Sequence, residues 1–224
     1  MTRFLSIAAS GAAFLTAALW TPDAQAQFYV RGHLMVTNPS DDSGSDVIEN
    51  GIDAGSLDAT FDAGLGFGGS VGWVFAERFR AEADFTYLSA DVDRATLGEG
   101  FSADGDNFAS TGLGVNLLYH FTDDIAGEQG FSPYIGLGVV FLNEIDIDLE
   151  GPGVGQGFED LEGDDVAPQL ILGVNRGIGE RWSLGGELRY LAGGGVDLEN
   201  DAVQIRDIDY DSLNLGLTLT YWFD

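Results

Sequence analysis

The final residues of the chain alternate between apolar side chains and polar or small ones almost without interruption. Leucine or an aromatic residue occupies every second position: Leu215, Leu217, Leu219, Tyr221 and Phe223. The positions between them hold Asn214, Gly216, Thr218, Thr220 and Trp222. A period of two places successive side chains on opposite faces of a β-strand. The pattern therefore predicts a C-terminal strand with one apolar face.

The same alternation recurs along the chain and predicts eight strands. They cover residues 27–37, 57–75, 79–94, 107–121, 132–148, 166–176, 181–197 and 214–224. The connections are long at 38–56, 95–106, 149–165 and 198–208, short at 76–78 and 177–180, and intermediate at 122–131. Long loops at one end and short turns at the other are typical of outer-membrane barrels. We expect the long loops to face the cell exterior and both chain ends to lie in the periplasm.

The faces opposite the apolar ones combine glycine with charged and amide side chains. Their polar members are Arg31, His33, Asp58, Asp62, Arg80, Glu82, Asp84, Asn116, His120, Gln169, Asn175, Glu187 and Arg189. The polar face of a soluble sandwich would instead be solvated and would hold few glycines. Small inward residues suit a narrow barrel, whose interior is just wide enough for side chains. The patterning predicts an all-β fold, an eight-stranded antiparallel up-and-down transmembrane β-barrel with lipid on its apolar side.

Aromatic residues gather near the short connections. They are Trp73, Phe75, Phe79, Tyr119, Phe121, Phe131, Tyr134, Trp182, Tyr221 and Phe223. Aromatic rings favour the membrane–water interface, so this end is expected to carry an aromatic girdle.

The N-terminus has the features of an export signal. Arg3 precedes an apolar run over residues 4–20, and Ala24-Gln25-Ala26 supplies a small-residue cleavage site. A membrane anchor is the alternative, but the run is short for a spanning helix. We therefore assign residues 1–26 to a signal peptide and residues 27–224 to one barrel domain.

The charge restricts the possible partners. The chain carries 37 acidic residues against nine basic ones, all of them arginine, for a net charge of −28. Nucleic acid is therefore an unsuitable partner. Many acids crowd the segments between strands, as in residues 41–46 and 159–165. These segments are either solvated loops or a surface that holds divalent cations, which prefer carboxylate oxygens. The chain has no cysteine, so it can form no disulfide.

Charges of both signs occupy the centres of the predicted strands. The inward-facing set comprises Arg31, Arg80, Glu82, Asp84, Glu187 and Arg189. A charge inside a narrow barrel must be paired or hydrated. We expect these six residues to form a paired polar plug. The alternative is a gate in a thin channel, opened by exchange of ion-pair partners.

Catalytic and metal-binding patterns are weak. The two histidines, His33 and His120, are on inward phases and lack a serine motif such as G-x-S-x-G. Residues 104–107 and 193–201 are only superficially similar to calcium loops and lack the EF-hand spacing. The sequence therefore predicts no enzyme, no cofactor and no specific metal site.

Three segments resemble the small outer-membrane β-barrel family, which includes opacity proteins and the barrel of outer-membrane protein A. They are residues 68–87, 132–140 and 182–190, similar to the family's second hairpin, fifth strand and seventh strand. The resemblance implies the barrel fold, an outer-membrane location and a terminal aromatic residue that the barrel-assembly machinery reads. Here Phe223 is next to last, before Asp224.

The sequence thus predicts a multi-pass barrel in the bacterial outer membrane with a structural or surface-interaction role. Its expected partners are outer-membrane lipid, lipopolysaccharide or divalent cations at the acidic loops, and the barrel-assembly machinery. A narrow porin-like channel for small solutes is the first alternative, and a lipid-modifying enzyme is the second.

Overall fold

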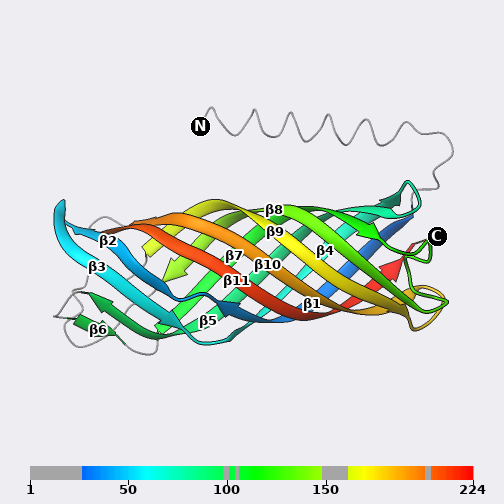
Figure 1. Ribbon diagram of the computed structural model, residues 1–224, viewed down its shortest axis with the longest axis horizontal. Helices are drawn as coiled ribbons and strands as arrows, with labels where there is room; N and C mark the ends of the chain where they lie inside the picture. The colour runs from blue at the N-terminus through cyan, green and yellow to red at the C-terminus, as the bar shows by residue number, and fades with distance from the viewer. Residues whose placement is uncertain (1–26, 98–100, 104–105, 148–160, 200–202, 224) are drawn as a thin grey trace.

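The computed structural model describes residues 27–97, 101–103, 106–147, 161–199 and 203–223 (Figure 1). The predicted signal peptide lies outside these residues, as do Asp224 and parts of the acidic segments at 95–106 and 149–165. Within the described ranges, no helix is long and apolar enough to cross a membrane. The strands are β1 (Phe28–Pro39), β2 (Asp42–Glu49), β3 (Ile52–Phe61), β4 (Gly64–Phe75), β5 (Phe79–Leu97), β6 (Phe101–Ala103), β7 (Asp106–His120), β8 (Phe131–Ile147), β9 (Leu161–Gly177), β10 (Trp182–Glu199) and β11 (Val203–Trp222).

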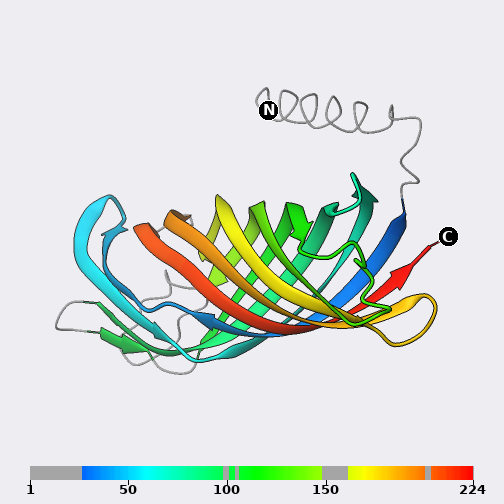
Figure 2. The ribbon, with the colours of Figure 1, turned by 45° about the vertical axis from the view of Figure 1, so that its right-hand side comes forward.

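Eight of these strands close into a ring. The order is β1-β4-β5-β7-β8-β9-β10-β11, and β11 pairs with β1 to complete the circle. Each neighbouring pair is antiparallel. The start of β1 and the end of β11 lie at the same end of the barrel as the short turns (Figures 1 and 2). The predicted eight-stranded antiparallel barrel is confirmed.

The terminal strand has the predicted faces. Leu213, Leu215, Leu217 and Leu219 are exposed on the outside of the barrel, while the residues between them are buried inside it. β11 is 20 residues long, whereas a strand needs about 9–11 residues to cross a membrane. The ring therefore continues beyond the bilayer at the end opposite the short turns.

The predicted long loop at residues 38–56 is wrong, because most of this segment forms a β-hairpin. β2 pairs with β3, and the turn between them is Asn50-Gly51. Both turn residues have positive φ, 50° and 78°, as a type I′ turn requires. The Asn-Gly pair was a hairpin signal in the sequence. The later predicted loops are also too long, since β5 reaches Leu97, β9 begins at Leu161 and β11 at Val203.

The β2–β3 hairpin continues the barrel wall beyond the ends of β1 and β4, on the side away from the short turns. β2 takes the place of β1 beside β11, and β3 takes the place of β4 beside β5. The predicted continuous strand over 57–75 is therefore interrupted, between Phe61 and Gly64. Leu57 and Ala59 point inward before this break, whereas Leu65 and Phe67 point outward after it. A one-residue slip exchanges the two faces of a strand.

This inversion corrects two of the predicted inward residues. Asp58 and Asp62 are both exposed, and Asp58 accepts a hydrogen bond from the Gly44 amide at 3.0 Å. They belong to the outer surface, and they do not contribute to the lumen.

Backbone pairing between the β1–β2 side and the β3–β4 side is interrupted at the break, although the Ser40 and Asp62 amides still donate to the Asp211 and Asp91 carbonyls of β11 and β5. The β1–β4 register ends at Thr37–Gly64, and the β2–β3 register begins at Asp42–Ala59. A side chain bridges the interval, because the Phe61 amide donates to Asp41 Oδ1 at 3.2 Å. β1 contributes Pro39 here, a residue that has no amide to donate.

The polarity of the barrel reverses along its length. Around the short-turn half, apolar side chains face outward and polar ones fill the interior, as in a membrane-spanning barrel. In the opposite half, acids such as Asp91 and Asp93 face outward and apolar side chains pack inside. That apolar cluster comprises Val47, Leu57, Ala90, Val92, Ala95, Phe108, Val140, Leu142, Ala167, Leu191, Leu198, Val203, Ile205 and Ile208. The outer half thus has the interior of a soluble domain.

Most of the predicted aromatic girdle is present at the short-turn end. Rings contact one another in pairs along its outer surface, such as Phe79–Tyr119 and Trp182–Tyr221, with centroids 5.2 and 5.0 Å apart. Tyr134 is an exception, because it points into the lumen and is only 2% exposed. Its position two residues after the inward-facing Ser132 gives it the inward phase.

Candidate functional site

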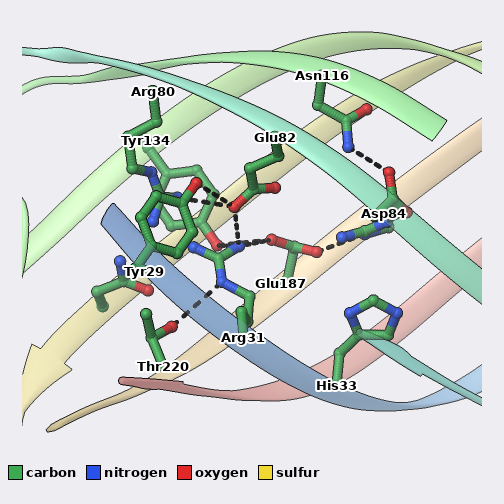
Figure 3. A network of polar contacts seen from close by, with 12 residues as sticks. Tyr29, Arg31, His33, Arg80, Glu82, Asp84, Asn116, Tyr134, Glu187 and Thr220 are labelled. Atoms are coloured by element: carbon green, nitrogen blue, oxygen red, sulfur yellow. Dashed lines mark hydrogen bonds and ion pairs between the residues drawn. The ribbon is translucent and has the colours of Figure 1, made fainter. Parts of the chain in front are cut away.

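The six predicted lumen charges meet inside the barrel (Figure 3). Arg80, Glu82 and Asp84 project from β5 at intervals of two residues, which keeps them on one face. Glu187 and Arg189 project from β10, on the opposite side of the eight-strand ring. Arg31 reaches in from β1. The ring closure brings these three strands together across the lumen, and we call the resulting assembly the charge ladder.

The ladder alternates in sign from one member to the next. Arg80 Nη2 lies 4.0 Å from Glu82 Oε1, which Arg31 Nη1 approaches to 3.2 Å. Arg31 Nη1 also lies 3.0 Å from Glu187 Oε2. Arg189 then bridges Glu187 and Asp84, with its Nη1 2.9 Å from Asp84 Oδ2. The order is Arg80, Glu82, Arg31, Glu187, Arg189 and Asp84, so each inner member lies between two opposite charges.

Neutral side chains add hydrogen bonds to the carboxylates. Tyr29 donates its hydroxyl hydrogen to Glu82 Oε1 and Tyr134 donates to Glu187 Oε2, both at 2.6 Å. Asn116 Nδ2 donates to Asp84 Oδ1 at 2.6 Å, and Gln169 donates to Asn116 in turn. All six charged residues are at most 5% exposed. Because a buried charge is costly unless it is paired and hydrogen-bonded, this geometry holds the ladder in one arrangement.

Inward-facing glycines make room for these side chains. A Cβ on Gly114 would lie 2.2 Å from Asp84 Oδ1, and one on Gly72 would lie 2.4 Å from the Tyr29 hydroxyl. A Cβ on Gly173 would lie 2.3 Å from Tyr134 Cζ. These three glycines therefore serve the plug, because they provide the space in which its tyrosines and carboxylates lie.

Residues 121–130 fold across the mouth of the lumen at the short-turn end, and we call this segment the stopper. Its Ile125 is 6% exposed and packs against Tyr29 and Trp222. Ser183 Oγ donates to the Ala126 carbonyl at 2.6 Å, and the Gly177 amide donates to the Gly127 carbonyl at 2.8 Å. The connection of intermediate length predicted at residues 122–131 thus covers the lumen at the Arg80 end of the charge ladder.

A small cavity separates the ladder from the apolar cluster above it. Its volume is about 30 Å³, and Arg189, Asn214, Gln169, Leu142 and Leu191 contribute to its lining. A cavity of this size admits little more than a water molecule.

The two histidines lie in the lumen, as predicted. His33 Nε2 is 3.4 Å from Thr86 Oγ1. His120 Nδ1 is 2.8 Å from Ser132 Oγ, and both residues are fully buried. In the part of the chain that the structure describes, no cluster of three or more His, Cys, Asp or Glu side chains could hold a metal ion.

Several residues of the site were not assigned to the lumen from the sequence. Tyr29 alternates in phase with Arg31, and Tyr134 with Ser132, so their inward direction was available from the period-two pattern. Ile125 lies in a connection without periodicity, and its place in the mouth of the barrel had no sequence signal.

Comparison with known proteins agrees with this architecture. The sequence profile of the outer membrane protein beta-barrel domain family matches residues 5–221. The chain belongs to this family. It is therefore a β-barrel of the bacterial outer membrane. No curated protein sequence matches the chain.

Solved structures support the fold. OprG from Pseudomonas aeruginosa is similar with a TM-score of 0.65 and 19% identity, over 87% of this chain and 95% of OprG. Neisserial surface protein A gives a TM-score of 0.56 and 17% identity, over 89% of this chain and all of that protein. The solid-state NMR structure of AlkL gives a TM-score of 0.54 and 16% identity, over 91% of this chain and 93% of AlkL. At these identities the likeness concerns the fold alone.

Proposed function

We propose that the protein is a sealed barrel that acts at the cell surface and does not carry ions. The charge ladder is the observation that supports this proposal. Six alternating charges cross the lumen, each at most 5% exposed, and each inner member lies between two partners. An ion that passed would have to separate buried pairs, and breaking such a pair costs about 3–5 kcal/mol. The stopper and the apolar cluster close the interior below and above the ladder.

The outer surface is then the part that can meet a partner. Exposed acids there include Asp46, Glu49, Asp53, Asp58, Asp91, Asp93 and Glu199, against the exposed arginines Arg94 and Arg206. Carboxylate oxygens bind divalent cations, and such cations bridge carboxylates to phosphate groups. We propose divalent cations and, through them, lipopolysaccharide head groups as partners of this surface.

A charge-removal variant tests this surface. The triple substitution Asp58→Asn, Asp91→Asn and Asp93→Asn keeps the size of each side chain and removes three negative charges. We expect it to weaken calcium-dependent binding of detached lipopolysaccharide to the purified barrel at least threefold, with an unchanged unfolding midpoint. Binding is measured by titration in detergent, with and without a calcium chelator. The cation bridge would be ruled out if the wild-type and variant barrels bound lipopolysaccharide equally. It would also be ruled out if the chelator left binding to the wild-type barrel unchanged.

We also propose that the buried histidines are structural. His120 and Ser132 form a contact that could otherwise suggest a base and a nucleophile. Both are 0% exposed, and the stopper covers that end of the lumen. A substrate lipid outside the wall has no access to this pair.

Passage of small apolar molecules is a second candidate, favoured by the apolar interior of the outer half and by the weakly paired wall beside it. The β2–β3 hairpin would have to move for such a molecule to enter. Asp46 and Arg206 are exposed partners in the β2–β11 register, and the chain has no other cysteine to interfere with a disulfide between them. Oxidation of the Asp46→Cys/Arg206→Cys variant would form a disulfide that fixes β2 to β11. If the second candidate is correct, cells that produce this variant should take up an apolar fluorescent probe more slowly after oxidation. Equal uptake in oxidised and reduced cells would eliminate it.

A further inference from the structure

The periplasmic end of the charge ladder differs chemically from its outer end. Asp84, the outer terminus, receives hydrogen bonds from Asn116, Thr86 and Arg189. Arg80, the periplasmic terminus, is 0% exposed, yet its Nε, Nη1 and Nη2 atoms have no hydrogen-bond partner among the described residues. Among the described residues, the one carboxylate oxygen within ion-pair distance of Arg80 is Glu82 Oε1 at 4.0 Å, and Tyr29 and Arg31 already contact that oxygen. Both oxygens of Asp84 thus have hydrogen-bond donors, whereas no nitrogen of Arg80 has a hydrogen-bond acceptor among the described residues.

Aromatic rings surround Arg80 without using its donors. The guanidinium carbon lies 4.8 Å from the ring centroid of Tyr134, 5.1 Å from that of Tyr29 and 5.9 Å from that of Trp222. A ring attracts a guanidinium through its face, whereas the N–H bonds of the guanidinium point outward in its own plane. The rings therefore stabilise the charge and leave the in-plane edge for an acceptor.

Two further nitrogen-bearing groups contact the Tyr134 ring beside Arg80. Arg31 lies over the Tyr134 ring at 5.6 Å, and His120 stacks on that ring at 5.0 Å. Arg31 Nη2 is buried and lacks a hydrogen-bond partner, whereas Glu82 Oε2 is the acceptor oxygen without one among the ladder residues. His120 Nε2 also lacks a partner, but a neutral imidazole has one donor and one acceptor nitrogen, so this atom is not counted as a donor. Nitrogen atoms thus outnumber unmatched acceptor oxygens around Tyr134. Buried polar atoms in native proteins almost always have partners, so this imbalance indicates a ligand that accepts hydrogen bonds.

We propose that the edge of the Arg80 guanidinium is a binding site for a small inorganic anion of the halide class. A cation is excluded by Arg80 and Arg31, and a large anion by the rings that enclose the site. The stopper controls access, because Ile125 packs on Tyr29 and Trp222, two of the rings around Arg80. The anion would supply Arg80 with the close negative partner that Glu82 does not provide. Charge-assisted hydrogen bonds of this kind are among the strong ones.

Diffraction from crystals grown in bromide tests the site, because bromide scatters anomalously and water does not. We expect an anomalous peak within hydrogen-bonding distance of Arg80 in the folded, full-length mature barrel. Arg80→Met removes the donors and keeps an unbranched side chain, and it should abolish the peak. Arg94→Met, at an exposed arginine of the same strand, is the matched control and should retain it.

A solution measurement keeps the test independent of crystals of the variant. In wild-type barrel and in Arg94→Met, the urea midpoint should rise with bromide at constant ionic strength, because a ligand of the folded state stabilises it. In Arg80→Met the midpoint should not respond. Should Arg80→Met fail to fold, the wild-type crystals decide alone. Density at the Arg80 edge without an anomalous signal would mean water only and would overturn the proposal.

Discussion

Replacing Glu187 with alanine is expected to lower the free energy of unfolding of the barrel by about 3–5 kcal/mol, the range observed when one partner of a buried ion pair is removed. Glu187 contacts Arg31, Arg189 and the Tyr134 hydroxyl at once. Its loss leaves Arg31 and Arg189 buried with one carboxylate partner each and separates the ladder into two halves. Urea unfolding of the barrel in lipid vesicles, followed by tryptophan fluorescence, measures the change.

The matched control for this variant is Glu199→Ala. Glu199 belongs to the same strand but is exposed, and its carboxylate accepts a hydrogen bond from Gln204 at 3.2 Å. An exposed substitution of this kind changes stability by about 0.5 kcal/mol or less. If Glu187→Ala and Glu199→Ala destabilise the barrel equally, the ladder does not hold the strands together as we describe.

A single added methyl group at Gly173 is expected to lower the free energy of unfolding by about 1–3 kcal/mol, the usual cost of overpacking. The new Cβ in Gly173→Ala would lie 2.3 Å from Tyr134 Cζ and 2.4 Å from its hydroxyl. Tyr134 would have to move, and its hydrogen bond to Glu187 and its contact with Arg80 would be lost with it. The same unfolding measurement applies.

Gly186→Ala is the control for this second variant. Gly186 lies in β10, and an added Cβ there would have no atom within 4 Å. Its stability should stay within about 0.5 kcal/mol of the wild-type value. If Gly186→Ala lowers the free energy of unfolding as much as Gly173→Ala does, the effect comes from replacing a glycine in the strand and not from a clash with Tyr134.

Much of the fold followed from the alternation of side chains. In β11 the apolar phase is unbroken, so both faces of the strand were predictable residue by residue. The phase argument failed at Phe61–Gly64, where Leu57, Ala59, Leu65 and Phe67 share one parity in the sequence but occupy opposite faces. The cause is physical. The hairpin lies in the outer half, which hides its apolar side chains, whereas β4 faces lipid and exposes them.

The sequence predicted which residues form the charge ladder, but it could not predict which charges contact each other. All six ladder residues were identified, because each occupies the polar face of its strand. Which charge meets which depends on ring closure, since it places β5 opposite β10 and lets Arg31 of β1 reach carboxylates from both strands. No local pattern contains that information. The stopper was equally inaccessible, because Ile125 is held by contacts with strands far away in the chain.

The resistance of the lumen to ions is the central claim, and planar-bilayer recording of the purified mature barrel tests it most directly. The stopper, the charge ladder and the apolar cluster together predict a silent bilayer for correctly folded wild-type protein, with folding verified by heat-modified electrophoretic mobility. Glu187→Ala, recorded in parallel, reports whether the ladder alone is the seal. Discrete current steps from the wild-type barrel, altered in size by Glu187→Ala, would contradict the account and establish the lumen as a channel.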